Sequence, residues 1–293
     1  MIRRPLGNTG LRVSALGFGA GPVGSPELSE SDAEALLKGV LDAGVNLLDT
    51  APSYGMSEER IGRHLQERRH EFVLSTKCGY GVPGVEDWTG PCITQGVELA
   101  LRRLRTDVID LLHFHSCPVE VLERPGVVDA LRRAVEQGKV RVAAYSGDNA
   151  PLGWALHSGA FGSVQTSVNV FDQRVLDWGV PVAREKGIGV IAKRPLGNAP
   201  WRFSERPGAH DIATYWDRMR AMALDTEGLD WSELALRFAA FAPGVSSCIV
   251  GTTKVENLQR NLSALEKGPL PEALVERIRD AFQRNGQGWD GLI

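Results

Sequence analysis

The sequence has little cysteine and lacks the apolar stretches that a membrane anchor or a secretion signal requires. Its 293 residues include four cysteines, and their spacing contains neither a CxxC pair nor a set of metal ligands. No apolar run reaches the roughly 18 residues of a membrane-spanning helix. The first five residues, MIRRP, lack the apolar core of a signal peptide. We therefore expect reduced thiols, a cytoplasmic location, no metal site and no membrane partner.

A large excess of charge of one sign is also absent. The chain carries 33 Lys and Arg residues against 36 Asp and Glu residues, which gives a formal net charge of −3. This balance argues against nucleic acid as the main partner, because nucleic-acid-binding proteins usually carry a basic excess. A hydrophobic content of 43% is typical of a globular protein with a large core. We expect a small-molecule ligand, and protein partners stay open.

What the sequence does contain is a regular alternation of strand-like and helix-like segments. Eight apolar runs with strand character cover residues 15–19, 46–50, 72–77, 109–115, 140–146, 163–169, 189–195 and 247–251. Segments with a helical spacing of apolar residues separate most of them. One of these begins at Ser31 and ends at Gly44, a residue type that often ends helices. Such alternation predicts a parallel sheet, and continuous apolar strands predict burial on both faces.

Eight strand–helix units without a break in composition predict an α/β fold, a closed (β/α)8 TIM barrel. A doubly wound open sheet is the alternative. Length alone would suggest about two domains, but α/β barrels often use this length as one unit, so we expect residues 1–293 to form a single domain. The turn signal Gly7-Asn8-Thr9-Gly10 predicts an N-terminal β-hairpin. A long loop at about 196–228 and a tail at about 270–293, with an extra C-terminal helix, are expected to cover the barrel mouth.

Four ionisable side chains lie at or near the C-terminal ends of three consecutive predicted strands. Lys77 and His115 each end a strand-like run, and Asp49 lies one residue before the end of another, with Tyr54 a few residues further on. A phenol has a pKa near 10, and a neighbouring lysine ammonium favours its ionised form. Tyr54 is therefore interpreted as a proton donor whose pKa Lys77 lowers, while Asp49 holds Lys77 in place.

His115 would then orient a substrate carbonyl. None of the four groups is a good nucleophile in this setting, so a complete reaction needs a hydride donor. Each residue alone has an ordinary structural explanation, such as a turn cap, a surface charge or a core histidine. The joint pattern favours the catalytic interpretation.

Several of these segments resemble motifs of the aldo-keto reductase family, and the resemblance covers nearly all of the chain. Residues 6–17 resemble its N-terminal hairpin and first strand, and Leu48-Asp49-Thr50-Ala51 through Tyr54-Gly55 resembles its Asp/Tyr signature. Ser75-Thr76-Lys77 resembles its lysine strand, and residues 109–115 resemble its histidine strand, with the catalytic histidine at His115 rather than His113. The resemblance implies a nicotinamide cofactor, NADP or as second choice NAD, bound across the barrel mouth.

The resemblance also implies cofactor-binding positions, most of them at strand ends and in the loops that follow. They are Gly19, Gly21, Asp49, Ser146, Gln165, Asn169, Lys193, Arg194, Leu196, Gly197, Asn198, Gly251, Thr252, Thr253, Lys254, Asn257 and Asn261. Tyr54, Trp88 and His115 are expected to line the substrate pocket. Many family members place a tyrosine against the nicotinamide where this chain has Lys193-Arg194. Gly251 and Asn257 replace a basic pair that often holds the 2′-phosphate of NADP, and Lys254 and Arg260 are candidates to compensate.

Residues 19–24 also match the GxGxxG pattern of dinucleotide-binding loops. Prolines at positions 22 and 26 interrupt the stretch, and no helix is expected before about residue 29. Because these glycines do not open a helix, we interpret the stretch as the first strand–helix loop, with its backbone near the nicotinamide.

The function indicated is the reduction of an aldehyde or ketone by hydride transfer from a nicotinamide, with Tyr54 as the proton donor. Two alternatives stay open. The same residues would serve an NAD-dependent sugar or alcohol dehydrogenase that runs this chemistry in reverse. The barrel could also bind the cofactor as a regulatory protein without significant turnover.

Overall fold

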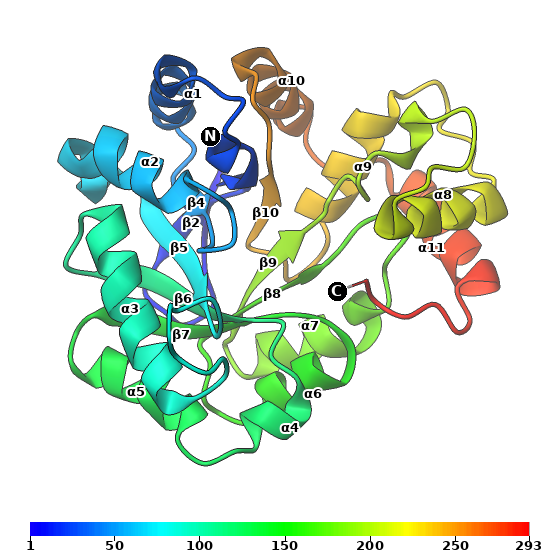
Figure 1. Ribbon diagram of the computed structural model, residues 1–293. Helices are drawn as coiled ribbons and strands as arrows, with labels where there is room; N and C mark the ends of the chain where they lie inside the picture. The colour runs from blue at the N-terminus through cyan, green and yellow to red at the C-terminus, as the bar shows by residue number, and fades with distance from the viewer. Residues whose placement is uncertain (293) are drawn as a thin grey trace.

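The protein is a closed barrel of eight parallel strands surrounded by helices (Figure 1). The structure is a computed structural model and describes residues 1–292. The strands follow one another around the barrel in chain order, and the last strand pairs with the first. They are β3 (Leu16–Gly19), β4 (Leu47–Asp49), β5 (Val73–Cys78), β6 (Ile109–His115), β7 (Val140–Ser146), β8 (Ser163–Ser167), β9 (Gly189–Lys193) and β10 (Ser247–Val250).

The pairing of β10 with β3 closes the barrel and places Cys248 beside Leu16. The predicted (β/α)8 fold is therefore confirmed. The doubly wound alternative is wrong, because an open sheet would leave two edge strands without a partner. All eight predicted strands are present, and those over residues 109–115 and 140–146 have the predicted bounds. The others differ by one or two residues at an end; for example, Asn169 and Pro195 lie in loops beyond β8 and β9.

An antiparallel hairpin of β1 (Arg3–Pro5) and β2 (Arg12–Ser14) precedes the barrel, as predicted. Its Leu6 and Val13 are fully buried against apolar residues at the N-terminal ends of the barrel strands. Leu6 lies so close to β9 that a Cβ atom on Gly189 would come within 2.5 Å of its side chain. The hairpin therefore closes the floor of the barrel, opposite the C-terminal ends of the strands.

Helices alternate with the barrel strands and form the outer layer. The α-helices are α1 (Glu30–Asp42), α2 (Ser57–Leu65), α3 (Gly90–Leu104), α4 (Val119–Leu122), α5 (Val127–Glu136), α6 (Asn149–His157), α7 (Val175–Glu185), α8 (His210–Met222), α9 (Trp231–Ala240), α10 (Val255–Glu266) and α11 (Glu272–Asn285). The helix predicted from Ser31 begins at Glu30, because Ser29 accepts a hydrogen bond from Asp32 N and caps it. Gly44, with φ of +81°, follows its C-terminal end as expected.

The segment from residue 196 to 228, expected as a long loop, contains the helix α8 and a 3-10 turn, η3 (Pro200–Arg202). Tyr215 and Met222 of α8 are buried in an apolar cluster shared with residues of α9 and α11. This second cluster lies beside the barrel core and supplies the burial that makes the segment helical. The helix α11 corresponds to the extra C-terminal helix that the sequence predicts.

The chain after α11 turns back toward the barrel strands, and its end lies near β8 in Figure 1. Gly291 N donates to Asn149 Oδ1 at 2.9 Å, and Ser167 Oγ donates to Leu292 O at 3.2 Å. These contacts place the tail at the C-terminal ends of β7 and β8. A single domain over the whole chain, and a mouth covered by the tail and the 196–228 segment, stay predictions.

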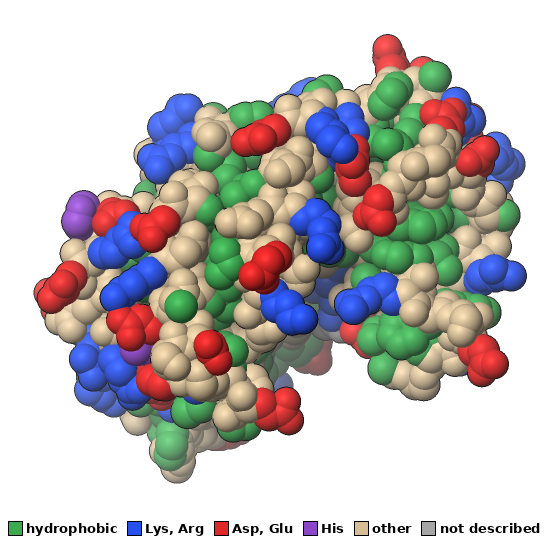
Figure 2. Space-filling model, turned by 90° about the horizontal axis from the view of Figure 1, so that it is seen from above, with side chains coloured by type: hydrophobic (Ala, Val, Ile, Leu, Met, Phe, Trp, Pro, Cys, Tyr) green, Lys and Arg blue, Asp and Glu red, His purple; other side chains and the backbone are tan. Residues whose placement is uncertain are grey.

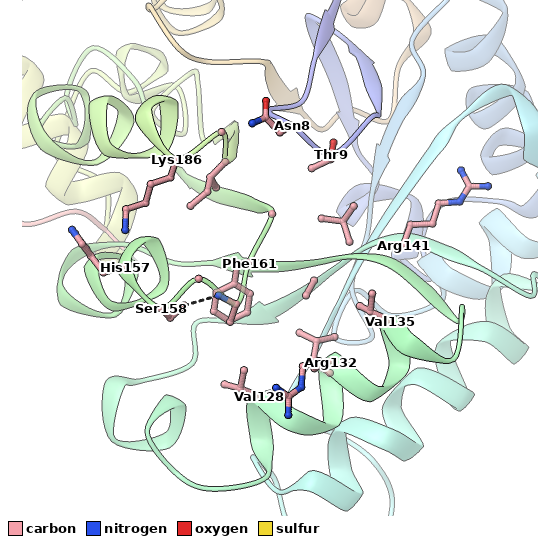
Figure 3. A pocket seen from close by; sticks show the side chains of 18 of the residues that line it. Asn8, Thr9, Val128, Arg132, Val135, Arg141, His157, Ser158, Phe161 and Lys186 are labelled. Carbon is pink, nitrogen blue, oxygen red and sulfur yellow. Dashed lines mark hydrogen bonds between the residues drawn. The ribbon is translucent and has the colours of Figure 1, made fainter.

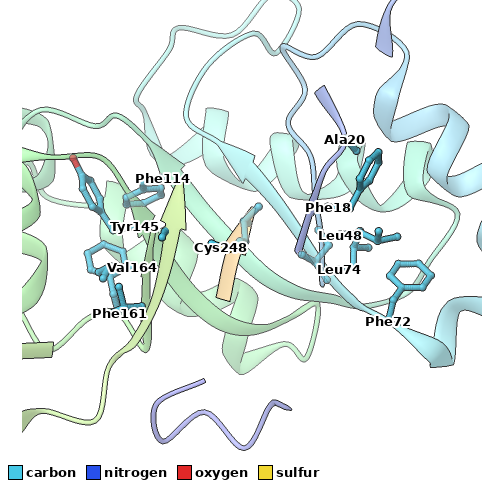
Figure 4. Packing of buried hydrophobic residues seen from close by; sticks show 14 of the residues in the cluster. Phe18, Ala20, Leu48, Phe72, Leu74, Phe114, Tyr145, Phe161, Val164 and Cys248 are labelled. Carbon is cyan, nitrogen blue, oxygen red and sulfur yellow. The ribbon is translucent and has the colours of Figure 1, made fainter. Parts of the chain in front are cut away.

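Side chains of alternating orientation separate an outer and an inner layer of the barrel. The outward residues pack against the helices and include Phe18, Leu48, Leu74, Phe114 and Val164 (Figure 4). The inward residues are apolar near the floor, with Leu47, Val73, Leu111 and Ile191. Further along the strands the buried residues become polar, with Asp49, Ser75, Lys77, His113 and Gln165. Since buried polar groups need partners, this change of character marks a candidate site.

The outer surface carries charges of both signs. On the face in Figure 2, Lys and Arg side chains are interspersed with Asp and Glu side chains instead of forming one patch. Among the helices of residues 1–292, none combines the length and the apolar character needed to cross a bilayer.

Candidate active site

Asp49 and Lys77 form an ion pair inside the C-terminal half of the barrel. They lie on the neighbouring strands β4 and β5, and each residue is only 2% exposed. Lys77 Nζ lies 2.7 Å from Asp49 Oδ2 and donates a second hydrogen bond, also 2.7 Å long, to Thr50 O. Ser75 Oγ donates to the other carboxylate oxygen, Asp49 Oδ1, at 2.7 Å. These bonds satisfy both buried charges and hold the ammonium in one place.

The pair stays ionised despite its burial. Burial alone would raise the pKa of Asp49, but the charge and hydrogen bond of Lys77, together with His113 and the Ser75 hydroxyl, outweigh it, so the pKa of Asp49 lies below its usual value. Burial would likewise lower the pKa of Lys77, and the Asp49 carboxylate together with Tyr54 reverses this, so the pKa of Lys77 is raised. A permanent positive charge therefore lies at the inner wall of the site.

Tyr54 places its ring near this charge. It lies in the loop between β4 and α2, and Lys77 Nζ is 5.0 Å from the centre of the ring. Close backbone packing fixes the loop, because a Cβ atom on Gly24 would come within 1.6 Å of Tyr54 O. Burial raises the pKa of Tyr54 more than the Lys77 ammonium lowers it. Lys77 lowers the pKa of Tyr54 as expected, but burial raises that pKa by more. Tyr54 is therefore a protonated phenol at neutral pH.

His115 faces Tyr54 from the end of β6. The two ring centres are 6.2 Å apart, and the ring planes are nearly perpendicular at 88°. Burial, followed by the charge of Lys77, lowers the pKa of His115 to about 3, so the imidazole is neutral at neutral pH. A neutral imidazole keeps one N–H donor. The four residues predicted as the catalytic set, Asp49, Tyr54, Lys77 and His115, thus converge at one end of the barrel.

His113 lies deeper in the barrel, beside Lys77 in the strand register. It is fully buried, and neither of its ring nitrogens has a hydrogen-bond partner. Burial lowers the pKa of His113 to about 4, so this ring is neutral as well. The ring contact with Tyr54 is made by His115 instead, and the choice of His115 as the catalytic histidine stays a prediction.

A polar network connects the ion pair with the predicted nicotinamide-binding residues of β7 and β8. Gln165 Nε2 donates to Asp49 Oδ1 at 2.9 Å, and Ser146 Oγ donates to Gln165 Oε1 at 3.0 Å. Asn169 follows β8, and its side-chain Nδ2 is buried without a hydrogen-bond partner. On the other side, Gly19 ends β3, and a Cβ atom on Gly21 would lie 3.7 Å from the Tyr54 ring. Gln165, Ser146 and Gly21 therefore lie next to members of the catalytic set, and their role toward a cofactor stays a prediction.

A second group of the predicted cofactor residues lines a separate pocket of about 280 Å3 near the start of α10: Leu196, Gly251, Thr252, Asn257 and Asn261. Thr253 and Lys254 are exposed next to it. Two arginines, Arg202 of η3 and Arg260 of α10, also line the pocket. No side chain caps the first turn of α10, and although Asn257 N donates to Lys254 O, the N–H groups of Val255 and Glu256 have no partner within residues 1–292 and can bind an anion. Arg202 was not predicted, since only the fold brings η3 to this pocket.

The end of β9 and the loop after it have three of their predicted cofactor residues paired within the protein. Lys193 pairs with Asp148 at 2.7 Å, Asn198 with Asp211 at 2.7 Å, and Arg194 with the backbone carbonyl of Leu292. Gly197 has φ of +52°, and a Cβ atom there would come within 2.8 Å of the Phe171 ring. Lys193, Arg194 and Asn198 thus each bind a different partner within the protein, and their role toward a cofactor stays a prediction.

Trp88, predicted for the substrate pocket, packs against Tyr80 and Phe114 in two edge-to-face contacts with ring centres 6.1 Å apart. Tyr80 rather than Trp88 touches His115, with its hydroxyl 2.5 Å from Nδ1. Tyr80, like Trp88, lies in a loop that the sequence places beyond a strand end, where an aromatic side chain can line a substrate pocket or pack the loop itself. Its hydrogen bond to His115 could not be predicted, because the two residues lie on different segments of the chain.

A larger cavity of about 1000 Å3 opens at the opposite end of the barrel, beside the turn of the N-terminal hairpin (Figure 3). None of the predicted site residues lines it. Two of its arginines, Arg132 and Arg141, are paired with Asp129 and Asp110 at 2.8 Å each. Volume alone would therefore point to the wrong end, because in barrels of this kind functional groups gather where the strands end.

Known proteins are similar to this chain in sequence and in fold. The sequence profile of the Aldo/keto reductase family matches residues 15–282. The chain is 30% identical to L-galactose dehydrogenase of Arabidopsis thaliana, over 89% of this chain and 87% of that protein. It is 27% identical to a probable voltage-gated potassium channel subunit beta of the same plant, with 97% of both chains covered.

Among solved structures, the aldo-keto reductase AKR11C1 from Bacillus halodurans in its holo form superposes with a TM-score of 0.84, at 27% identity and with 96% of both chains covered. The family match contains all eight barrel strands together with Asp49, Tyr54, Lys77 and His115. Members of this family are oxidoreductases that depend on a nicotinamide cofactor. The chain therefore belongs to the aldo/keto reductase family of NAD(P)H-dependent oxidoreductases.

Proposed function

We propose that this protein reduces an aldehyde or ketone, with Tyr54 as the proton donor to the substrate oxygen. The proposal depends on one arrangement above all, the Tyr54 ring 5.0 Å from the charged Lys77 ammonium and opposite the neutral His115. We place the substrate oxygen between Tyr54 and His115, and we assign the outer wall of the pocket to Trp88 with Tyr80.

Each of these residues has a defined task. As negative charge develops on the substrate oxygen, the protonated Tyr54 delivers its proton there. The Lys77 ammonium, 5.0 Å from the centre of the ring, stabilises the phenolate that remains, because an opposite charge nearby favours the ionised phenol. Asp49 keeps Lys77 in position, and His115 donates a hydrogen bond to the same substrate oxygen.

The residues around the barrel mouth suit a nicotinamide dinucleotide. A carboxamide offers both a donor and an acceptor, and it would find the unpaired Asn169 amide as well as Gln165 and Ser146. The free backbone N–H groups at the start of α10 suit a phosphate. When bound, the nicotinamide supplies the hydride that reaches the carbonyl carbon.

We propose NADP rather than NAD as the preferred cofactor. Arg202 and Arg260 line the pocket at the start of α10, and Lys254 lies beside it. Guanidinium groups bind phosphate oxygens in a paired geometry, which would favour the dinucleotide with the additional 2′-phosphate. These three cations take the place of the basic pair that Gly251 and Asn257 replace.

Two related functions remain alternatives. L-galactose dehydrogenase is among the relatives, which favours a sugar or alcohol dehydrogenase that uses Tyr54 as a base in the reverse direction. The potassium channel relative favours a regulatory barrel that binds the cofactor. The ionised Asp49–Lys77 pair next to Tyr54 supports turnover instead. A cytoplasmic location is also proposed, on the cysteine spacing alone.

Titration with NADPH and NADH, followed by a panel of carbonyl and polyol substrates, tests the proposal. We expect Tyr54→Phe to lower turnover by at least about 100-fold, since general acid catalysis supplies roughly that much, while the Kd for the cofactor stays within a few fold. Tyr145→Phe is the matched control, because its hydroxyl bonds to Cys117 O at 2.9 Å on the outer side of the barrel. Near-normal turnover in Tyr54→Phe would exclude the phenol as the acid. Cofactor binding without turnover of any substrate would favour the regulatory function.

A further inference from the structure

Tyr80 makes a specific contact with the candidate catalytic histidine. Its hydroxyl oxygen lies 2.5 Å from His115 Nδ1, and the two rings stack with centres 5.5 Å apart at an interplanar angle of 23°. The same hydroxyl lies 3.3 Å from Ser53 Oγ, in the loop that carries Tyr54. The Tyr80 side chain therefore connects the loop after β5 with His115 and with the loop that carries Tyr54.

Packing and hydrogen bonds within its own loop hold Tyr80 in this position. Gly79 has φ of +131°, and a Cβ atom there would come within 2.2 Å of the Trp88 ring. Trp88 N donates to Gly79 O at 2.7 Å, and Gly81 N donates to Asp87 Oδ1 at 2.9 Å. The Trp88 ring then packs edge-to-face on the Tyr80 ring. The contact between Tyr80 and His115 is thus supported from behind by an ordered turn.

The proton count at this contact leaves two arrangements. His115 is neutral, so it carries one proton, on Nδ1 or on Nε2. If Tyr80 donates to Nδ1, the proton of His115 is on Nε2, and the phenol proton is not available for the 3.3 Å contact with Ser53 Oγ. If Nδ1–H donates to Tyr80 instead, Tyr80 must use its own proton on the longer 3.3 Å contact with Ser53.

The first arrangement fits the site better. In both arrangements one proton lies in the 2.5 Å contact, but the first pairs the better donor, the phenol O–H, with the better acceptor, the imidazole nitrogen. It also leaves an N–H on the far nitrogen of His115, which is the nitrogen that does not face Tyr80. Only this tautomer can donate to a substrate oxygen through Nε2, because the other one presents a lone pair there.

We propose that Tyr80 is a positioning residue that holds His115 in the Nε2–H tautomer, so that His115 serves as a hydrogen-bond donor to the substrate oxygen. The role at the substrate rests on the proposed function. The tautomer itself does not, since it is a property of the free protein. Tyr80 thereby acts through His115 without touching the reacting atoms.

Two measurements on the full-length protein test this. The first is the tautomer of His115, read from nitrogen chemical shifts of 15N-histidine-labelled protein without substrate and assigned with a His115→Gln spectrum. We expect Nε2–H in the wild type and a mixture of both tautomers in Tyr80→Phe, which keeps the stacked ring but loses the hydroxyl. The second is steady-state kinetics, in which we expect Tyr80→Phe to lower kcat roughly tenfold, as for the loss of one hydrogen bond, with KM and cofactor Kd within about twofold.

The possible outcomes test the role of Tyr80 separately from the proposed carbonyl reduction. An Nδ1–H tautomer in the wild type overturns the proposal, and this result needs no variant to fold. An unchanged tautomer in Tyr80→Phe, or an equal loss of kcat in the control Tyr145→Phe, overturns it as well. If the wild type reduces no carbonyl substrate, the proposed function fails, whereas the Nε2–H tautomer and its loss in Tyr80→Phe would still support the role of Tyr80.

Discussion

Replacing Lys77 by methionine is the sharpest test of the electrostatic design of the site. The substitution keeps a long unbranched side chain, with a thioether sulfur in place of one methylene, and removes the ammonium group. Lys77 Nζ lies 5.0 Å from the centre of the Tyr54 ring. At an effective dielectric constant of about 20, two unit charges about 4–5 Å apart interact by about 3–4 kcal/mol, so the ammonium strongly favours the phenolate. We therefore expect kcat/KM to fall about 100-fold or more.

The dependence of kcat/KM on pH is a second measure of the interaction between Lys77 and Tyr54. In carbonyl reduction Tyr54 must be protonated, so the rate falls at high pH as the phenol ionises. Without the ammonium the pKa of Tyr54 rises further, and the high-pH limb should move to higher pH. Steady-state kcat/KM measured at rising pH follows this limb. The pH range must extend beyond the ordinary phenol pKa of about 10.

A loss of folding must be distinguished from a loss of catalysis. Lys77→Met leaves the Asp49 carboxylate buried without its cation, which typically costs about 3–5 kcal/mol of stability. The double variant Lys77→Met/Asp49→Asn removes both charges, so most of this stability should return in urea unfolding while activity stays low. The electrostatic reasoning is refuted if the single variant keeps the wild-type pH profile, or if the double variant regains wild-type kcat/KM.

Two further predictions concern the scaffold. Burial, followed by the charge of Asp148, raises the pKa of Asp172 from 3.8 to about 7. The folded protein therefore holds a proton that the unfolded chain releases, and the free energy of unfolding should fall between about pH 4 and pH 7, by at most about 4 kcal/mol from this group. Asp172→Asn should remove this decline in urea titrations at pH 5 and pH 8; an equal slope in both proteins would contradict the assignment. Gly24→Ala places a Cβ atom 1.6 Å from Tyr54 O and should lower kcat/KM sharply, whereas Gly39→Ala in α1, with 3.6 Å to Val255, should be neutral or slightly stabilising. Equal kcat/KM in both glycine variants would show that the Tyr54 loop does not depend on this contact.

Much of the fold could be predicted because its signals are local. Strand runs such as Ile109–His115 combine continuous apolar character with a length typical of buried strands, and helices between them stop at glycines such as Gly44. Parallel strands in chain order must end at the same side of a barrel. The convergence of Asp49, Lys77 and His115 therefore followed from three sequence positions.

The helix α8 and the contacts of the loops were less predictable. The segment of residues 196–228 has a weaker helical pattern, and α8 depends on burial of Tyr215 and Met222 against α9 and α11. The partner of Lys193 is Asp148, on the loop after a different strand. Such pairings depend on the path of two loops at once, and neither path has a periodic signal in the chain.

The amino-acid sequence by itself determined the barrel, its floor hairpin and the strand ends that carry the four ionisable groups, because apolar periodicity and turn residues act over a few neighbouring positions. Only the tertiary structure decided the net protonation of those groups. Burial raises the pKa of Tyr54 against the pull of Lys77, and the Tyr80 hydroxyl meets His115 across 35 positions of sequence. Desolvation and hydrogen bonding depend on the whole surroundings of a side chain, and those exist only once the barrel has closed.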